Sequence, residues 1–498
     1  MTYQFPAGFW WGGASSAPQS EGAAAEGGKG KTIWDHWYEL EPERFYQKVG
    51  PNDTDDFFHR YEEDVELMCK AGFNSFRTSL SWARLIPDGD GEVNQEGVQF
   101  YRRMISCLRE HGIRPVLNLY HFDMPLALQQ QGGWENRHTV DAFVRYASFC
   151  FDTFGDLAED WLTFNEPIVP VEGGYLYGFH YPAVCDMKRA VQVGYHTMLA
   201  SAGAIAQGRA KHPEFRFGIV LNLTPSYPRD AADPGDAEAS RIADLLFNRS
   251  FLTPSVRGCW PEGLGEILGR YGWLPERAAG EKELLEKGTI DFLGVNYYQP
   301  RRVQKKQTPC SAPKLPEDLF SYYQWEDAEM NTSRGWEIYP KGVYDIAVML
   351  RDEYGNLPWY ISENGIGIMD EEQFADETGM ILDDYRIRFI RRHLTWLAQA
   401  MQEGCACFGY HIWTFLDNWS WCNAFKNRYG LVRLDKEHGN ARVPKRSFAW
   451  FAQTAATNSI ELEKGEMARY ERGSLSQCKK TMGDNGIRNV CALRTFHL

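Results

Sequence analysis

Two glutamates stand at corresponding places in the sequence, each directly after a short apolar stretch. Residues 161–165 lead into Glu166, and residues 359–362 lead into Glu363. Cleavage of a glycosidic bond needs one carboxylic acid that protonates the leaving oxygen and one carboxylate that attacks the sugar or activates water. Glu166 and Glu363 can fill these roles if the fold brings them together.

The fold that would do so is predicted by the hydrophobic pattern. Eight apolar runs have the length of buried strands: residues 9–13, 75–79, 115–120, 161–165, 217–221, 292–297, 359–362 and 408–413. Apolar residues spaced by three and four predict helices between them: residues 56–70, 95–111, 140–154, 187–211 and 384–403. This alternation predicts an α/β protein with a single (β/α)8 barrel and elaborated loops on its carboxyl face.

Chemistry in such barrels lies at the carboxyl ends of the strands, so Glu166 and Glu363 are predicted to face each other there. Arg77, Asn296 and Tyr298 also lie in or near strand ends. We expect them to support an ionised Glu363, because hydrogen-bond donors favour the charged form of a carboxylate.

The barrel is expected to span residues 1–456, and residues 457–498 to form a weakly ordered C-terminal tail because they show little periodicity. Three insertions, residues 32–55, 304–335 and 417–429, are expected to be loops on the active face. The charged stretch of residues 384–392 is interpreted as a solvated helix face.

Composition narrows the partners. The formal net charge of -14 disfavours nucleic acid and anionic membranes, and no run of 18 apolar residues predicts a membrane span. The N-terminus lacks the pattern of a signal peptide, and the 11 cysteines are mostly scattered, so a cytoplasmic protein with reduced thiols is expected. No His or Cys cluster has metal-ligand spacing, so we expect neither a metal nor another cofactor. The oligomeric state, including a homo-oligomer, stays open.

Five short motifs occur in a consistent order along nearly the whole chain. They are residues 9–14 with 19–22, His121-Phe122-Asp123, Asn165-Glu166-Pro167, Asn296-Tyr297-Tyr298 and Ser362-Glu363-Asn364-Gly365. Together they resemble the signatures of glycoside hydrolase family 1. The resemblance implies a retaining mechanism, with Glu166 as general acid/base and Glu363 as nucleophile. It also implies that Gln19, His121, Asn165 and Trp413 bind sugar hydroxyls or stack on the ring.

The loop after the eighth strand separates branches of that family. In this loop plain glucosidases carry a sequence similar to Asn-Phe-Glu-Trp, whose glutamate binds the 4- and 6-hydroxyls of the sugar. This chain has Ser420 at the position of that glutamate. A serine removes like-charge repulsion toward a 6-phosphate, and Lys426 and Tyr429 are the expected further phosphate ligands. The phospho-glycosidases often carry lysine two places before the tyrosine, where this chain has Asn427. Lys426 or Arg428 is therefore expected to supply the charge.

The small-molecule partner is accordingly expected to be a phosphorylated β-glycoside, most simply a 6-phospho-β-glucoside. Phe122 supports this, because plain glucosidases usually have tryptophan between that His and Asp. Trp421 is expected in the sugar site, and a bulky ring at this position resembles the sequences of phospho-galactosidases. The activity of a 6-phospho-β-galactosidase therefore stays open as an alternative, as does that of a plain β-glucosidase. A catalytically silent sugar-binding barrel is the alternative from another class, which the two glutamates disfavour.

Overall fold

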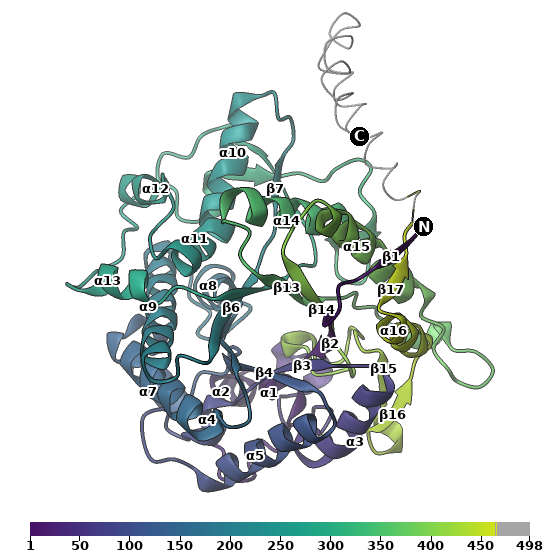
Figure 1. The fold of residues 1–498 in the computed structure, drawn as a ribbon. Coiled ribbons are helices and arrows are strands. Elements are labelled where there is room, and N and C mark those ends of the chain that lie inside the picture. Colours follow the sequence, from purple (N-terminus) through teal and green to yellow (C-terminus); the bar gives the residue numbers. More distant parts are fainter. Residues whose placement is uncertain (464, 466–498) are drawn as a thin grey trace, which may run out of the picture.

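The computed structural model describes residues 1–463 and residue 465. A closed barrel of parallel strands forms its centre, in the order β13-β14-β2-β3-β4-β5-β6-β8 (Figure 1). The barrel strands are β2 (Trp10–Ala14), β3 (Ser75–Ser79), β4 (Arg114–Tyr120), β5 (Asp160–Asn165), β6 (Arg216–Asn222), β8 (Phe292–Asn296), β13 (Trp359–Asn364) and β14 (Cys407–Trp413). Each corresponds to one of the eight predicted runs, which confirms the predicted barrel.

A ring of helices surrounds the strands (Figure 1). The main ones are α3 (Phe57–Lys70), α5 (Gln95–Glu110), α7 (Arg137–Phe154), α9 (Met187–Lys211), α11 (Ser250–Arg257), α14 (Lys341–Glu353), α15 (Asp384–Gln402) and α16 (Arg446–Thr457). The five predicted helices are all present, with ends displaced by three residues at most. Side-chain caps define several starts: Asn94, Asn136 and Asp186 accept hydrogen bonds from the first turns of α5, α7 and α9.

Shorter elements occupy the connections. The helices are α1 (Ala17–Ser20), α2 (Ile33–Leu40), α4 (Trp82–Leu85), α6 (Leu126–Gln130), α8 (Ile168–Glu172), α10 (Pro234–Asp244), α12 (Leu264–Arg270) and α13 (Glu281–Lys287). The strands are β1 (Thr2–Gln4), β7 (Ser226–Pro228), β9 (Arg301–Lys305), β10 (Phe320–Tyr322), β11 (Met330–Asn331), β12 (Trp336–Glu337), β15 (Val432–Asp435), β16 (Ala441–Pro444) and β17 (Ser459–Glu461). The insertions predicted as loops thus contain α2 and β10–β11 as local structure.

Large side chains fill the barrel at the amino ends of the strands. Six strands contribute one residue each to this apolar cluster: Trp10, Val116, Leu162, Val220, Phe292 and Tyr360. The barrel is therefore a packed core rather than a pore. Gly12 permits the close approach of β2 and β3, because a Cβ atom there would lie 2.0 Å from the Ser75 carbonyl oxygen.

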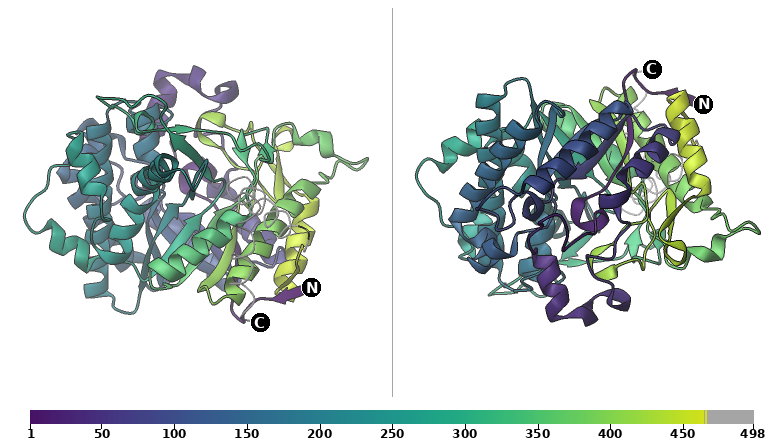
Figure 2. Two further views of the ribbon diagram at one scale, coloured as in Figure 1. Left: turned by 90° about the horizontal axis from the view of Figure 1, so that it is seen from above. Right: turned by 90° about the horizontal axis from the view of Figure 1, so that it is seen from below.

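The two ends of the described chain lie together. β17 pairs antiparallel with β1, next to the yellow helix α16 (Figure 2). Residues 459–461, which we assigned to the C-terminal tail, therefore pair with β1, the strand that precedes the barrel, in a separate two-stranded sheet. Residues 464 and 466–498 of that predicted tail lie outside the described residues.

The charged stretch at the start of α15 is a solvated face only in part: Asp384 and Arg388 are exposed, but two of its arginines are not. Arg386 and Arg392 are almost fully buried. Arg386 forms ion pairs with Asp383 (2.8 Å) and Glu371 (2.6 Å), and it also donates to the Tyr429 carbonyl oxygen (2.7 Å). Periodic charges looked like a surface because the sequence does not show the acidic partners that the fold brings to them.

The nine cysteines within the described residues are all free thiols. Among the helices that the structure describes, none combines the length and the apolar character that crossing a membrane requires.

Candidate active site

One cavity of about 660 Å³ opens at the carboxyl ends of the barrel strands. Its lining includes ten of the thirteen predicted site residues: Gln19, His121, Asn165, Glu166, Tyr298, Glu363, Trp413, Ser420, Trp421 and Tyr429. Arg77 and Asn296 are fully buried and bond to the two glutamates. Lys426 is not part of the cavity wall.

Glu166 follows the last residue of β5 in a strained conformation. Its φ of 41° is unusual for a residue with a side chain, and its N–H donates to the Val220 carbonyl oxygen of β6 (2.8 Å). Burial, and after it the repulsion from Glu363, raises the pKa of Glu166 to about 8. A carboxyl with this pKa is mostly protonated at neutral pH and can act as an acid.

Glu363 lies within β13 and receives two donors. Arg77 Nη2 forms an ion pair with Oε1, and the Tyr298 hydroxyl donates to Oε2 at 2.6 Å. Arg77 is fully buried, so this ion pair is shielded from water. The two donors stabilise the negative charge of Glu363, as a nucleophile requires.

Asn296 lies elsewhere than we expected. Its Nδ2 donates to Glu166 Oε1 (2.7 Å) and to Asn165 Oδ1 (3.2 Å), and no hydrogen bond joins it to Glu363. The register of β8 against β6 and β13 determines this, and register was not part of the sequence argument. Asn296 therefore contacts Glu166, the expected acid, rather than Glu363, the expected nucleophile.

Arg77 also organises the residues predicted to bind sugar. Its Nη2 donates to Asn165 Oδ1 (3.1 Å), and Asn165 Nδ2 lies 3.1 Å from His121 Nε2. Burial and the charge of Arg77 hold the pKa of His121 well below its usual value, so this ring is neutral. Gln19, on α1, donates to the Trp419 carbonyl oxygen (3.0 Å). These amide and imidazole groups supply both donors and acceptors for sugar hydroxyls.

Aromatic rings form one wall of the cavity. The Trp421 ring lies 5.3 Å from Phe122 and 5.9 Å from His121, centroid to centroid, and 4.5 Å from Trp34 behind it. Trp413 stacks on His121 at 6.1 Å. Such faces suit the apolar surface of a sugar ring.

Of the three phosphate ligands predicted in the loop after β14, two line the cavity and one does not. Ser420 and Tyr429 line the cavity. Lys426 Nζ instead lies 5.7 Å from the ring centroid of Tyr46, and the Arg428 guanidinium lies 5.2 Å from that of Phe425. Neither cation is part of the cavity wall.

Two arginines that the sequence argument missed do line the cavity. Arg301 begins β9, and Arg334 lies in the turn between β11 and β12. Nothing in the sequence distinguishes Arg334 from the three lysines of residues 304–335, or Arg301 from its neighbour Arg302. The only local signal is the Gly335-Trp336 pair after Arg334, since Trp336 also lines the cavity.

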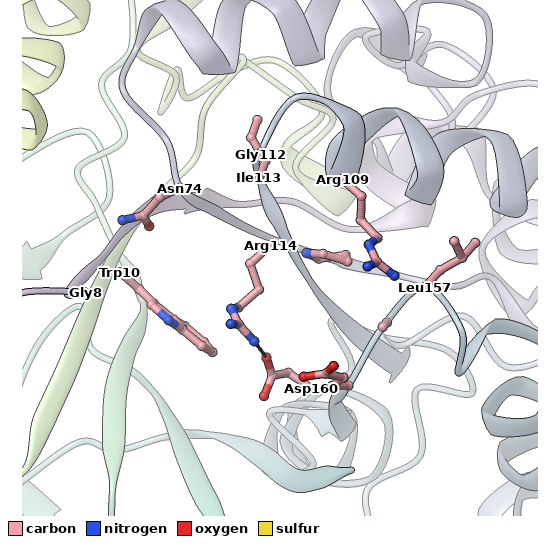
Figure 3. A pocket seen from close by; sticks show the side chains of 12 residues that line it. Gly8, Trp10, Asn74, Arg109, Gly112, Ile113, Arg114, Leu157 and Asp160 are labelled. Carbon is pink, nitrogen blue, oxygen red and sulfur yellow. Dashed lines mark hydrogen bonds and ion pairs between the residues drawn. The ribbon is translucent and has the colours of Figure 1, made fainter. Parts of the chain in front are cut away.

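A second cavity, of about 420 Å³, lies at the amino ends of the strands (Figure 3). Its buried carboxylate, Asp160, is paired with Arg114 (2.9 Å) and Arg216 (2.5 Å). Paired charges at this end of a barrel indicate a role in stability. Within residues 1–463 and 465, no group of three or more His, Cys, Asp or Glu side chains is arranged to hold a metal ion.

Comparison with known proteins agrees with this geometry. The sequence model of Glycosyl hydrolase family 1 matches residues 1–460. The chain is 54% identical to the 6-phospho-beta-glucosidase GmuD of Bacillus subtilis, over 91% of this chain and 98% of that protein. It is 35% identical to a 6-phospho-beta-galactosidase of Clostridium acetobutylicum, over 89% and 95% of the two chains. A family 1 β-glucosidase structure from Thermotoga maritima superposes with a TM-score of 0.85 at 34% identity, covering 92% of this chain and all of that one. The chain therefore belongs to glycosyl hydrolase family 1.

Proposed function

We propose that the protein is a retaining glycoside hydrolase that cleaves 6-phospho-β-glucosides to glucose 6-phosphate and an aglycone. One observation carries the substrate choice. The loop after β14 contributes Ser420, Trp421, Cys422, Asn423 and Tyr429 to the cavity, and none of these is acidic. A glutamate at position 420 would repel a phosphate in a poorly hydrated site, whereas a serine can donate a hydrogen bond to it.

In the first step, Glu166 protonates the glycosidic oxygen while Glu363 attacks the anomeric carbon from the opposite face. The leaving group departs with the proton, and a covalent glycosyl-enzyme forms. The pKa of about 8 keeps Glu166 protonated for this step, and the ion pair with Arg77 stabilises the negative charge with which Glu363 attacks.

In the second step, water attacks the same carbon and Glu166, now ionised, accepts its proton. Glu363 is released as a carboxylate. Since Glu363 repels the charge on Glu166, neutralisation of Glu363 in the covalent intermediate lowers the pKa of Glu166. The same glutamate thus changes from acid to base at the right moment.

The relatives differ in their named activities, and the one with higher sequence identity supports a phosphorylated glucoside. The protein at 54% identity is named for 6-phospho-β-glucosidase activity, whereas those near 35% include a plain glucosidase and a phospho-galactosidase. The argument for a phosphorylated substrate therefore depends on both Ser420 and the most similar of these relatives. A phosphorylated sugar is a metabolite of the cell interior, so the substrate is consistent with the cytoplasmic location that we propose.

The test compares 4-nitrophenyl β-glucoside, its 6-phosphate and the two galacto epimers as substrates. We expect kcat/KM to be highest for the 6-phosphoglucoside, by at least the ~10-fold that one hydrogen bond to a charged group provides. Better turnover of the unphosphorylated glucoside would overturn the proposal, and better turnover of the 6-phosphogalactoside would reassign the epimer. No turnover of any of the four would favour a silent sugar-binding barrel.

A further inference from the structure

The cavity wall carries more negative than positive charge. Among the lining residues that the structure describes, the acidic ones are Glu166, Glu172, Glu317 and Glu363, and the arginines are Arg301 and Arg334. A doubly charged phosphate in this cavity requires a cation that no carboxylate already neutralises.

Arg301 does not meet this requirement. Its Nη2 forms an ion pair with Glu172 (3.3 Å), and its guanidinium lies 3.5 Å from the ring centroid of Phe247. Arg334, by contrast, forms no ion pair with any carboxylate among the residues that the structure describes. Its Nε, like Arg301 Nη1, is buried without a hydrogen-bond partner. A guanidinium without an anion at the wall of a substrate cavity is arranged for an incoming one.

The fold holds Arg334 in place from both sides. It lies in the turn of the β11–β12 hairpin, where Gly335 has a φ of 69°. The hairpin is tied to the loop after β13, because Asn331 Nδ2 donates to the Gly367 carbonyl oxygen (3.1 Å) and the Met369 N–H donates to Ser333 Oγ (3.1 Å).

Packing then directs the side chain toward the active site. The Arg334 guanidinium lies 4.2 Å from the ring centroid of Trp336, and the Trp336 ring lies 5.5 Å from that of Tyr298, whose hydroxyl donates to Glu363. The charge of Arg334 also reaches Tyr429, where it opposes the rise in the phenol pKa that burial causes. Arg334 therefore lies near the tyrosine expected to bind phosphate, and Ser420 lines the same cavity.

We propose that Arg334 binds the phosphate group of the substrate, in place of a lysine from the loop after β14. This inference rests on the proposed 6-phospho-β-glycosidase function. Arginine suits the task, because its planar fork can donate two parallel hydrogen bonds to phosphate oxygens. It also accounts for Asn427, since a cation from the β11–β12 hairpin makes a lysine at that position unnecessary.

The test measures the ratio of kcat/KM for 4-nitrophenyl β-glucoside 6-phosphate to that for the unphosphorylated glucoside. We expect R334A to lower this ratio by about 10- to 200-fold, the range for a lost hydrogen bond to a charged group, and R334K to lower it less. Competitive inhibition by inorganic phosphate should weaken in R334A. K314A removes an exposed lysine of the same insertion and should leave the ratio unchanged.

The ratio separates this inference from the proposed function. An unchanged ratio in R334A, with a wild-type enzyme that prefers the phosphorylated substrate, would refute the role of Arg334 and leave the proposed function intact. A fall in K426A but not in R334A would return the role to the lysine expected from the sequence. A wild-type enzyme that prefers the plain glucoside would instead overturn the proposed function itself.

Discussion

Replacement of Asn296 by alanine should shift the pH dependence of the enzyme toward higher pH. Asn296 Nδ2 donates to Glu166 Oε1 at 2.7 Å, and it is the one side-chain donor recorded for that carboxyl within the described residues. A donor to a carboxylate favours its ionised form, so loss of the donor raises the pKa. Because Glu166 must be protonated for the first step, activity is lost as pH rises through its pKa.

The size of the shift follows from the hydrogen bond. A bond to a charged group contributes about 1.5–3 kcal/mol, and 1.36 kcal/mol corresponds to one pKa unit, so the expected rise is about 1 to 2 units. The wild-type basic limb is expected near the Glu166 pKa of about 8. In Asn296→Ala it should therefore lie about 1 to 2 units higher.

The assay measures kcat/KM for phenyl 6-phospho-β-glucoside between about pH 6.5 and about pH 10.5. At the lower limit the substrate phosphate, with a pKa of about 6, is already largely dianionic, so its own titration contributes little to the profile. A phenyl leaving group depends more on acid assistance than 4-nitrophenyl does. Glu166→Gln should abolish the basic limb, which would assign it to this residue.

Asn222→Ala is the matched control. Asn222 ends β6, pairs in register with Asn296 and lines the same cavity, but no hydrogen bond joins it to Glu166. The basic limb of the pH profile of Asn222→Ala should stay at the wild-type position. A limb that is unchanged or lowered in Asn296→Ala would show that this amide does not set the protonation of the acid.

Three further predictions concern the nucleophile, the substrate and the fold. Glu363→Ala should reduce turnover by several orders of magnitude and allow azide rescue to the product of inverted configuration; normal turnover would refute the assigned nucleophile. Ser420→Glu should remove the preference for phosphorylated over plain glucoside by like-charge repulsion, and an unaltered kcat/KM ratio would place the phosphate elsewhere. Arg386→Met should lower the free energy of unfolding in urea by about 3–5 kcal/mol, because it leaves buried Asp383 without an ion pair and Glu371 with Lys445 alone. Loss of the exposed Arg446–Asp384 pair in Arg446→Ala should cost less than about 1 kcal/mol. Equal losses in these two variants would contradict the distinction between buried and exposed ion pairs.

The barrel could be predicted from the sequence because each of its strands and helices has a pattern within its own residues. A buried strand such as residues 217–221 shows its apolar run, and a helix such as α9 shows its periodicity, without reference to the rest of the chain. The placement of Glu166 and Glu363 in one cavity follows from the same pattern, because the carboxyl ends of all barrel strands meet at one face.

Contacts between distant segments were not accessible in this way. We expected Asn296 to support Glu363 because both residues lie at the ends of barrel strands. The register of the strands instead directs the Asn296 amide to Glu166. Arg386 was interpreted as a surface charge because Glu371, its buried partner, arrives from a loop.

The sequence by itself thus determined the barrel, the two carboxylates and the absence of an acidic residue at position 420. Only the tertiary structure decided which cations line the cavity. Lys426 is close to Ser420 in sequence but lies against Tyr46, whereas Arg334 is brought to the cavity by a hairpin anchored on the loop after β13. The physical reason is that helix and strand preferences act over a few residues, while the direction of a charged side chain depends on packing between segments far apart in the chain.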